Sequence, residues 1–274
     1  MRNELLHTGS PSGVTDAFDA VAASFDERFE NAITRRIRDK VYGIVERLLP
    51  PPSALLDINC GTGIDAMAFA RRGYSVTGID ISPGMIQQAK GKVPALPSFN
   101  ATFSVGSFEH LSERVHGSFD LAFSNFGGLN CTENLSGVAK EVATLLNPGG
   151  YFIAVIMPPF SLREFFSYAL RGDFRKAFRR MQRGTSATGF EGKSFTVFYH
   201  SPWKFLEACS PWFAFRDQVG LSILSATPQS THVAHSFPRT ARFLERMDML
   251  IERWPLLRSL GDHYVMILQR RGHS

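Results

Sequence analysis

The chain has 274 residues, a formal net charge of +5 and an ordinary hydrophobic fraction of 44%. This length accommodates one large domain or one domain with a lid, and the small positive charge does not by itself indicate a nucleic-acid partner. No apolar run reaches the roughly 20 residues that a membrane-spanning helix needs, which argues against stable membrane insertion. Three widely spaced cysteines favour neither a disulfide framework nor a metal site.

The N-terminal residues 1–13 lack the apolar core of a signal peptide, and we expect them to be disordered in a cytoplasmic protein. Residues 14–52 follow with apolar side chains at three- and four-residue steps. This spacing predicts one or two helices that end at the proline run 50–52. The rest of the chain shows no low-complexity linker, so we expect residues 14–274 to form a single domain.

The next segment has the order strand, glycine turn, helix, strand, acid. Residues 55–58 have the length of a buried strand, and Cys60-Gly61-Thr62-Gly63 leads into a helical pattern that stops at Gly73. A second apolar run ends in Asp80. Such a turn lets the backbone approach a ligand at a helix start, and an acid at the tip of the second strand can hold a ribose diol.

This geometry also fits dinucleotide-binding enzymes, and Asp57 favours a different ligand. An acid four residues before the glycines suits a cationic amine and sulfonium, whereas it repels a pyrophosphate. The stretch Asp57-Ile58-Asn59-Cys60-Gly61-Thr62-Gly63 resembles the first motif of the class I S-adenosylmethionine (SAM) methyltransferases, roughly D-x-G-C-G-T-G. Asn59 replaces a glycine of that motif, and we expect asparagine to tolerate the backbone angles required there. A nicotinamide dinucleotide stays the alternative ligand.

Three further segments resemble motifs of the same family in the same order. Residues 18–30 resemble the helix that folds over the cofactor cleft, residues 119–124 the F-D-x-x-x-S strand, and residues 147–150 the L-x-P-G-G turn. The resemblance implies an α/β, doubly wound, Rossmann-like fold with a seven-stranded sheet. Its SAM-binding core would span residues 53–157, with lid insertions after the fifth and sixth strands.

The resemblance also implies which residues hold the cofactor. Asp80 would hold the ribose, Ser107 and Phe108 the adenine, and Asn125 the region near the sulfonium or the acceptor; Phe108 is a plain core residue in the alternative interpretation. The expected cofactor contacts are Asp57, Asn59, Cys60, Gly61, Gly63, Asp80, Ile81, Met85, Ser107, Phe108, Asn125 and Phe126. Phe25 and Arg35 are further candidates from the N-terminal helices, and no metal ligand is expected.

Two insertions, residues 159–200 and 228–261, are expected to cover the substrate side of the cleft. In the first, the spacing predicts a helix from residue 174 with its apolar side on the core (Phe174, Ala177, Phe178, Met181) and its basic side in water (Arg175, Lys176, Arg179, Arg180, Arg183). The alternative places this helix on an anionic membrane or an acidic carrier protein. Residues 193–200 alternate like an edge strand. In the second insertion, residues 238–254 read as a helix with a buried apolar face (Phe243, Leu244, Met247, Leu250, Ile251).

Methyl transfer from a sulfonium is an in-line displacement by a reactive donor, so positioning and exclusion of water matter most. A general base helps when the acceptor is a hydroxyl or a protonated amine. His200 and Tyr199, at the end of the alternating segment, are the first candidates for catalysis. Further candidate histidines are His110, His232, His235 and His263.

The sequence therefore predicts an S-adenosyl-L-methionine-dependent methyltransferase that acts at oxygen or nitrogen and releases S-adenosyl-L-homocysteine. Its aromatic-rich insertions favour a small hydrophobic or aromatic acceptor, such as a secondary metabolite or a quinone-like ring. Residues 125–128 lack the N/D-P-P-Y motif, and no RNA-binding appendage is recognisable, so no nucleic-acid partner is expected. The alternatives are a lipid- or carrier-bound acceptor and a non-catalytic SAM-fold binding subunit. The sequence carries no signal of an oligomeric state.

Overall fold

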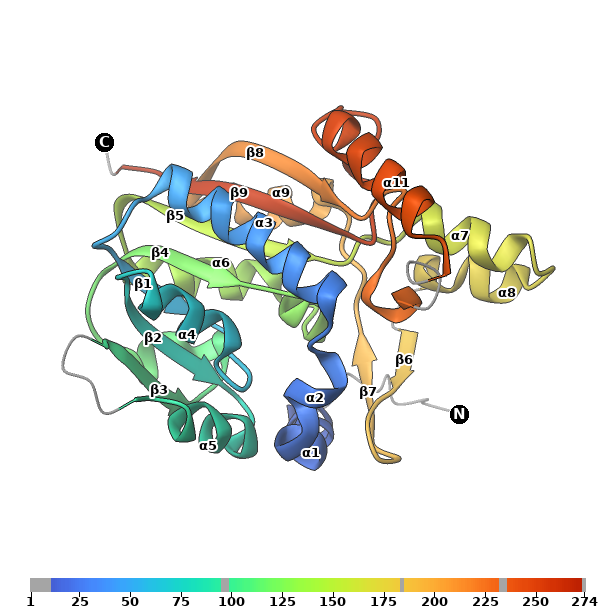
Figure 1. The fold of residues 1–274 in the computed structure, drawn as a ribbon. Coiled ribbons are helices and arrows are strands. Elements are labelled where there is room, and N and C mark those ends of the chain that lie inside the picture. The colour runs from blue at the N-terminus through green and yellow to red at the C-terminus, as the bar shows by residue number, and fades with distance from the viewer. Residues whose placement is uncertain (1–10, 95–98, 183–184, 232–235, 273–274) are drawn as a thin grey trace, which may run out of the picture.

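The structure, a computed structural model, describes residues 11–94, 99–182, 185–231 and 236–272. Its centre is a seven-stranded sheet with helices on both faces (Figure 1). The strand order is β3-β2-β1-β4-β5-β9-β8, and β9 runs antiparallel to both of its neighbours. The strands are β1 (Ala54–Asp57), β2 (Ser75–Asp80), β3 (Ala101–Val105), β4 (Phe119–Ser124), β5 (Leu146–Ile156), β8 (Phe213–Leu221) and β9 (His263–Arg270). This doubly wound arrangement confirms the predicted fold class, and its strand order reverses between β1 and β4.

Two apolar cores lie on the two faces of the sheet, because successive residues of a strand point to opposite sides. Leu55 belongs to the core beneath one set of helices, and its neighbour Leu56 belongs to the other core. The first set is α3 (Ala32–Leu48), α4 (Ile64–Arg71) and α5 (Pro83–Gly91). The second set is α6 (Leu135–Leu145), α9 (Pro202–Cys209) and the 3₁₀ helix η2 (Phe108–Glu113). Both faces of the central parallel strands are therefore buried, as expected for this architecture.

The N-terminal region differs from the prediction of one or two helices. It contains α1 (Pro11–Val21), the 3₁₀ helix η1 (Ala22–Ser24) and α2 (Phe25–Phe29) before α3 begins. The break before α3 arises because Asn31 adopts an extended backbone and caps that helix, its side-chain oxygen accepting from two backbone N–H groups at 3.0 Å. Disorder was expected for residues 1–13, but residues 11–13 are helical. Residues 1–10 lie outside the described part.

The prediction for residues 174–183 was wrong in both length and orientation. This part of the chain forms a four-residue α8 (Phe174–Ala177) and the 3₁₀ helix η4 (Arg179–Met181), and it follows α7 (Leu162–Ala169). Of its predicted buried face, Ala177 is buried, whereas the other three side chains are exposed (Phe174, Phe178, Met181). Arg180, predicted to lie in water, is buried because it pairs with Glu164 and Asp262. Arg183 lies outside the described residues.

The buried face predicted for residues 238–254 also needs correction. The helix there is α11 (Pro238–Ile251), and its Phe243 and Leu250 are exposed. Asp248 is buried instead, and its carboxylate accepts hydrogen bonds from the backbone N–H groups of Leu224 at 2.8 Å and Ser225 at 3.1 Å. A polar contact with the loop after β8 therefore anchors this helix, together with the buried Ile251, rather than a full apolar stripe.

A small two-stranded sheet lies beside the N-terminal helices. Its strands are β6 (Thr185–Thr188) and β7 (Ser194–Val197), so the strand predicted at 193–200 is shorter than expected. The rings of Phe18 on α1 and Phe195 on β7 lie 5.5 Å apart. The remaining short helices are η3 (Gly128–Cys131) and η5 (Pro228–Ser230). In the part of the chain that the structure describes, we find no helix with the length and apolar character to cross a membrane.

Candidate functional site

A pocket lies at the carboxyl ends of β1, β2 and β4, next to the reversal of strand order. It encloses about 1040 Å³ of empty space including its mouth. Ten of the twelve residues expected to contact the cofactor line it, and so does Phe25. The ten are Asn59, Cys60, Gly61, Asp80, Ile81, Met85, Ser107, Phe108, Asn125 and Phe126. Open α/β sheets bind their ligands at this position.

The glycine turn needs its glycines for two different reasons. Gly61 and Gly63 have φ values of +53° and +80°, which side chains with a Cβ rarely adopt. Gly61 lines the pocket, whereas Gly63 lies behind it, where an added Cβ would come within 3.0 Å of Ala89 and 3.1 Å of Phe103. Gly63 thus allows α4 to begin close against its neighbours instead of contacting the ligand directly.

Asp80 is fixed at the tip of β2 by backbone donors. Its two carboxylate oxygens accept hydrogen bonds from the N–H groups of Gly61 and Ser82, both at 2.9 Å. Burial raises the pKa of Asp80, and these two hydrogen bonds oppose the rise. The same interactions orient the carboxylate, which retains free lone pairs at the edge of the pocket.

Asp57 does not line the pocket, contrary to its expected role as a contact. It is buried below the turn, and its Oδ2 atom has no hydrogen-bond partner among the described residues. Burial, reinforced by the nearby Asp65 carboxylate, raises the pKa of Asp57 well above its usual range. A second acceptor without a described partner, Oδ1 of Asn59, lies on the pocket wall.

The reason given for Asn59 in place of glycine was wrong. Asn59 is not among the described residues with positive φ, so no unusual backbone angle requires it. Its side-chain amide instead donates to the backbone carbonyl of Asn125 at 3.1 Å and joins the ends of β1 and β4. Gly128 makes room for this amide, since an added Cβ there would lie 2.1 Å from the Asn59 nitrogen.

The basic residue at this site is Arg38, whereas the candidate named from the sequence was Arg35. Arg35 is exposed, and Arg38 lines the pocket with its guanidinium 4.7 Å from the centre of the Phe126 ring. Arg38 donates to Glu30 at 2.9 Å and pairs with Asp65. One face of α3 carries, at four-residue steps, the buried residues Thr34, Arg38 and Tyr42. A charged residue in such a buried row is the feature that singles out Arg38.

Asp65 in the first turn of α4 collects three donors beneath the pocket wall. It accepts hydrogen bonds from Arg38, from the hydroxyl of Tyr42 and, at 3.1 Å, from the amide of Asn125. Burial and the Asp65 carboxylate raise the pKa of Tyr42, which keeps its hydroxyl protonated and donating. Asn125 also holds its neighbour in place, since its Oδ1 accepts from the N–H of Phe126, which has a φ of +45°. Such strained positions cluster at ligand-binding sites.

The turn after β3 forms the other end of the pocket. The Ser107 hydroxyl accepts a hydrogen bond from the N–H of Glu109 at 3.1 Å and caps η2. Phe108 both lines the pocket and packs against the second core, so it is a core residue that also forms part of the pocket wall. Glu109, which the sequence analysis did not single out, lines the pocket and accepts from the hydroxyl of Thr132.

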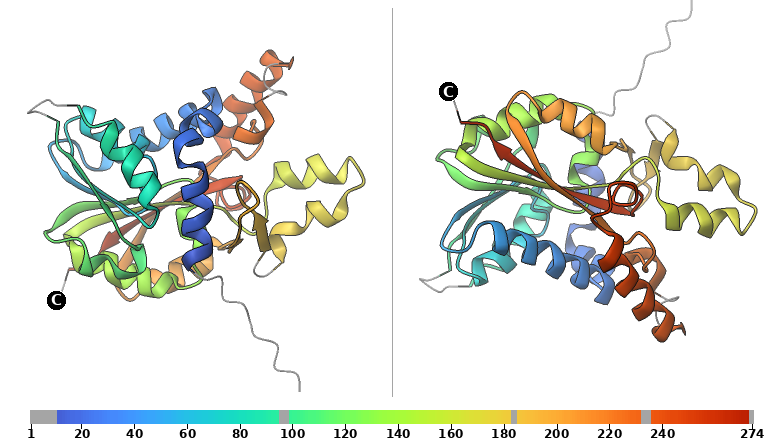
Figure 2. Two further views of the ribbon diagram at one scale, coloured as in Figure 1. Left: turned by 90° about the horizontal axis from the view of Figure 1, so that it is seen from below. Right: turned by 90° about the horizontal axis from the view of Figure 1, so that it is seen from above.

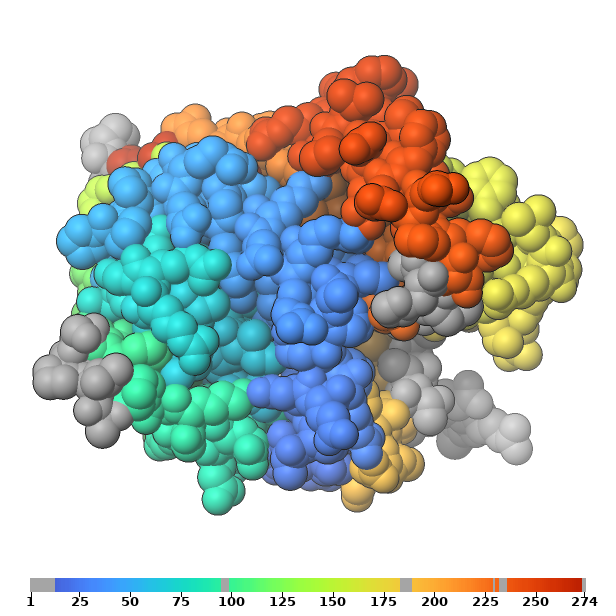
Figure 3. Space-filling view, viewed as in Figure 1, coloured from blue at the N-terminus to red at the C-terminus, as the bar shows by residue number. Residues whose placement is uncertain are grey.

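The N-terminal helices cover the pocket, as the family resemblance implied. Asp19 on α1 accepts from the N–H of Gly84 at 2.8 Å and from the Ser82 hydroxyl, and Asp26 on α2 pairs with Lys92 and Thr62. Phe18 and Phe25 line the pocket from these helices. The space-filling view shows this blue segment along the front of the molecule, between the SAM-fold core and the gold β6–β7 strands (Figure 3).

The structure does not bring the first catalytic candidates to this pocket. Tyr199 and His200 line a separate hollow, and Nε2 of His200 lies 2.9 Å from the backbone oxygen of Thr132. Burial lowers the pKa of His200, a shift that this contact opposes. His110 is exposed, with its ring nitrogen 3.6 Å from Glu113. The two other candidates in the loop, His232 and His235, lie outside the described residues.

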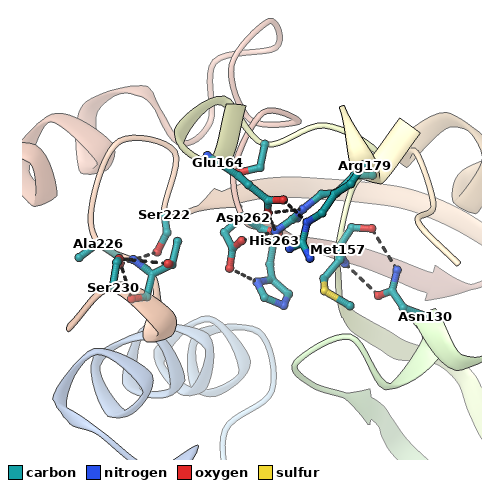
Figure 4. Close-up of polar contacts among 12 residues, drawn as sticks. Asn130, Met157, Glu164, Arg179, Ser222, Ala226, Ser230, Asp262 and His263 are labelled. Atoms are coloured by element: carbon teal, nitrogen blue, oxygen red, sulfur yellow. Dashed lines mark hydrogen bonds and ion pairs between the residues drawn. The ribbon is translucent and has the colours of Figure 1, made fainter. Parts of the chain in front are cut away.

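His263, at the start of β9, lies at the same end of the sheet as the pocket, next to the carboxyl end of β5. Its ring meets Phe126 edge to face at 5.8 Å, and its Nδ1 lies 3.1 Å from Oδ2 of Asp262 (Figure 4). Arg180 donates to the other Asp262 oxygen at 2.6 Å. Burial alone would raise the pKa of Asp262, but His263 and Arg180 lower it. A permanently charged carboxylate therefore orients this imidazole.

The surroundings of His263 are held by polar contacts on both sides (Figure 4). Asn130 bonds both the N–H of Met157 at 2.9 Å and its carbonyl at 3.0 Å, which fixes the end of β5. The loop after β8 is tied to the strand by a bond from the N–H of Asp262 to Ser222 at 3.2 Å. Among the described residues, Nε2 of His263 has no hydrogen-bond partner.

Comparisons with known proteins agree with this geometry. The sequence profile of the family described as "Methyltransferase domain" matches residues 55–150. Demethylmenaquinone methyltransferase of Tropheryma whipplei is 27% identical over 155 residues, which cover 54% of this chain and 61% of that protein. 2-Methyl-6-phytyl-1,4-hydroquinone methyltransferase of a Synechocystis strain is 35% identical over 106 residues, covering 38% of this chain and 32% of that protein. The matches thus span less than two thirds of these relatives.

Solved structures show the same fold over nearly the whole chain. Magnesium protoporphyrin IX methyltransferase of Synechocystis, solved with bound SAH, has a TM-score of 0.61 at 15% identity and covers 96% of this chain and 100% of that one. The CcbJ methyltransferase of Streptomyces caelestis has a TM-score of 0.62 at 15% identity, covering 94% and 99%. The motif set, the fold and the matched profile agree: residues 55–150 match a methyltransferase domain, and the chain has the fold of SAM-dependent methyltransferases.

Proposed function

We propose that this protein is an enzyme that methylates oxygen or nitrogen of a small hydrophobic or aromatic molecule with SAM. One observation carries the proposal: a single pocket has an unpartnered acceptor for a cationic amine at one end and a backbone-oriented acid at the other. On the pocket wall, Oδ1 of Asn59 has no hydrogen-bond partner among the described residues and suits an ammonium donor. The carboxyl of Asp57, with its unpartnered Oδ2, lies beneath the turn. Asp80 suits a ribose diol.

The remaining parts of SAM also find matching groups. The guanidinium of Arg38 lines the pocket, and its Nη2 has no described hydrogen bond, so it can donate to the carboxylate of the ligand. Phe108 offers a ring to the adenine, and Ser107 offers a hydroxyl to the exocyclic amine. When bound, SAM supplies an electrophilic methyl group on a sulfonium. The protein binds it, orients it and excludes water by means of α1 and α2.

We infer that His263 accepts the proton of the acceptor. Asp262 binds Nδ1–H, which leaves the lone pair on Nε2 as the basic atom. The ring lies against Phe126, a residue of the pocket wall, so this base is close to the cofactor residues on the acceptor side. Arg180 neutralises the second Asp262 oxygen and fixes the pair. This assignment takes the place of His200 and Tyr199.

The nature of the acceptor is proposed from the lining of the insertions and from the relatives. The rings of Phe160, Phe165 and Phe178 form one aromatic group in the first insertion, and Phe18, Phe190 and Phe195 form another beside the N-terminal cover. The names of the relatives specify a menaquinone precursor and a hydroquinone. A hydroxylated aromatic ring fits both observations, with residues 159–200 and 228–261 as its cover.

Calorimetry and a turnover assay test the proposal in two steps. Titration with SAM and with S-adenosylhomocysteine should give saturable heat, and a set of hydroquinones and catechols should yield S-adenosylhomocysteine with at least one member. Absence of heat with either ligand would reject the assigned pocket. Binding without turnover on any phenolic acceptor would instead favour a non-catalytic SAM-binding subunit.

A further inference from the structure

The hairpin of α7 and α8 projects from the body of the molecule (Figure 2) and carries large apolar side chains that are exposed. Both views of Figure 2 show it extending away from the sheet. Five side chains of this segment are between 44% and 86% exposed. They are Phe166, Leu170, Phe174, Phe178 and Met181, which we call the hairpin patch. Exposed apolar side chains gathered on one projecting segment are typical of interaction sites on proteins.

The inner side of the hairpin is already occupied, so the patch cannot simply turn inward. Arg180 is buried and bonds to Glu164 at 2.7 Å and to the backbone oxygen of Asp262 at 3.0 Å. The ring of Phe165 packs against Phe160 at 5.5 Å, and Phe178 lies beside it at 5.3 Å while 44% exposed, at the border between the inner side and the patch. A buried ion pair and an aromatic contact therefore fix which side faces the body. Rotation of the hairpin would break the pairing of a buried guanidinium, which is costly.

The charge around the patch is strongly positive. Residues 162–181 contain six basic residues and two acids, Glu164 and Asp173. Both acids are engaged, Glu164 by two arginines and Asp173 by Lys176 at 3.0 Å. Arg171 and Arg175 are exposed and form no ion pair within the described part of the chain. Apolar side chains among unpaired arginines are the composition of a segment that lies in a membrane interface.

We propose that the hairpin patch docks on an anionic lipid surface, with its apolar side chains at the acyl boundary and Arg171 and Arg175 on the lipid phosphates. The occupant is argued from charge and shape. The patch is a convex projection with net positive charge, which a fluid anionic surface can accept at any curvature, whereas a protein partner must supply a matching groove. The helices of the hairpin are too short to span a bilayer, so the contact is with one leaflet.

The proposal concerns where the protein binds, and it stands whether or not the proposed methyl transfer does. If that function holds, docking brings the acceptor side of the pocket towards molecules dissolved in lipid, because Arg180 of the hairpin and His263 share the carboxylate of Asp262. A lipid-soluble acceptor would then reach the site without crossing water. The two ideas fail separately, since SAM binding involves none of the patch residues.

Vesicle flotation of the full chain tests the docking. The probe is a vesicle of phosphatidylglycerol and phosphatidylcholine, compared with one of phosphatidylcholine alone. One variant reverses charge on the hairpin (Arg171→Glu with Arg175→Glu), and a second removes apolar surface (Leu170→Ser with Phe174→Ser). The matched control reverses two exposed, unpaired charges on α4 and α5, beside β2 and β3 (Arg71→Glu with Lys90→Glu).

We expect the unmodified chain and the control to float with the anionic vesicles only. Each hairpin variant should lose at least about tenfold in partitioning. The first variant removes the attraction of two arginines to lipid phosphates, which salt screens, and the second removes apolar surface from the membrane interface. Flotation that the hairpin variants share equally with the unmodified chain would overturn the proposal, and so would absence of flotation. Binding to an acidic acyl carrier protein that only the charge reversal abolishes, without flotation, would overturn it in favour of a carrier. Calorimetry with SAM on the same samples should show unchanged affinity in every variant.

Discussion

At the scale of single residues, the site depends on side chains whose orientation is fixed by neighbours other than the ligand. Asp80 is held by two backbone N–H groups, and Asn125 by Asp65 and Phe126. Such preorganisation lowers the conformational cost of binding. It also means that small changes of charge, with shape retained, are the most informative substitutions here.

Asp80→Asn should weaken SAM binding by roughly 10- to 100-fold, because a hydrogen bond to a charged group contributes about 1.5–3 kcal/mol. The amide keeps the size of the side chain and can still accept from Gly61 or Ser82. Isothermal titration calorimetry measures the change. Asp39→Asn, at an exposed position on α3, is the control and should bind as the unmodified chain does. An unchanged Kd for Asp80→Asn would show that the ribose is held elsewhere.

His263→Gln should reduce kcat by roughly 10²- to 10⁴-fold while the Kd for SAM stays the same, as expected for a lost general base. Steady-state kinetics measures kcat, and calorimetry measures the Kd for SAM. The charged groups around the ring are Asp262, Arg180 and Glu164, with Arg38 beyond Phe126.

The control for this experiment is His200→Gln, the base candidate that the sequence favoured. His200 faces the carbonyl of Thr132 and lines a separate hollow, so its replacement should leave kcat nearly unchanged. The opposite result, a retained kcat in His263→Gln and a lost one in His200→Gln, would assign the base to His200.

At the scale of elements, the buried ion pairs between segments distant in sequence decide how the insertions sit on the sheet. Arg180 of η4 contacts Asp262 just before β9, across 82 residues of sequence. The same Asp262 orients His263. The first insertion and the last strand are therefore coupled through one carboxylate, and a change there should affect both stability and catalysis.

Asp262→Asn should lower the free energy of unfolding at neutral pH by about 1.5–3 kcal/mol, the usual contribution of a hydrogen bond to a charged group, because Arg180 keeps its pair with Glu164 and loses its pair with Asp262. The pKa of Asp262 is lower in the folded chain than in the unfolded chain, so its contribution is present above the unfolded value, near 4, and is lost as the pH falls towards the folded value. Urea unfolding between pH 7 and pH 3 should thus show a smaller decline in the variant. Equal slopes would mean that this pair contributes nothing to acid stability.

At the level of the whole molecule, two acids, Asp57 beneath the pocket and Asp80 on its wall, make the ligand-free protein less stable than it could be. Asp57 and Asp80 both have raised pKa values, chiefly through burial. A carboxyl with a raised folded-state pKa binds a proton more readily in the folded chain, so the free energy of unfolding declines as the pH rises through that range. A cationic ligand opposes this cost, which links stability to cofactor binding.

Asp57→Asn should therefore raise the melting temperature of the ligand-free protein at pH 7.5 by roughly 2–4 °C, about 1 kcal/mol for a chain of this size. The same variant should bind SAM more weakly, since the negative charge below the turn is gone. Thermal denaturation with and without SAM measures both effects. A lower melting temperature without ligand would show that the carboxylate is structurally needed, contrary to its unpartnered Oδ2.

Local patterns along the chain were enough to predict several parts of this protein. The turn at residues 60–63, the acid at residue 80 and the alternation of apolar strands with helices are encoded within short stretches, and the pocket lies where they predict. Residue periodicity carries this information because strand and helix formation and backbone conformation at glycine are set by neighbours in the chain.

Which charged side chains meet depends on how distant segments pack in the folded chain. Arg38 rather than Arg35 reaches the pocket because α3 presents the face that includes Thr34 and Tyr42 to the sheet. His263 was one histidine among several until β9 placed it beside Phe126, and Arg180 became buried because Asp262 lies opposite. Pairing energies between distant segments leave no periodic trace in a sequence, so the acceptor side of the site and the exposed hairpin patch follow from the fold alone.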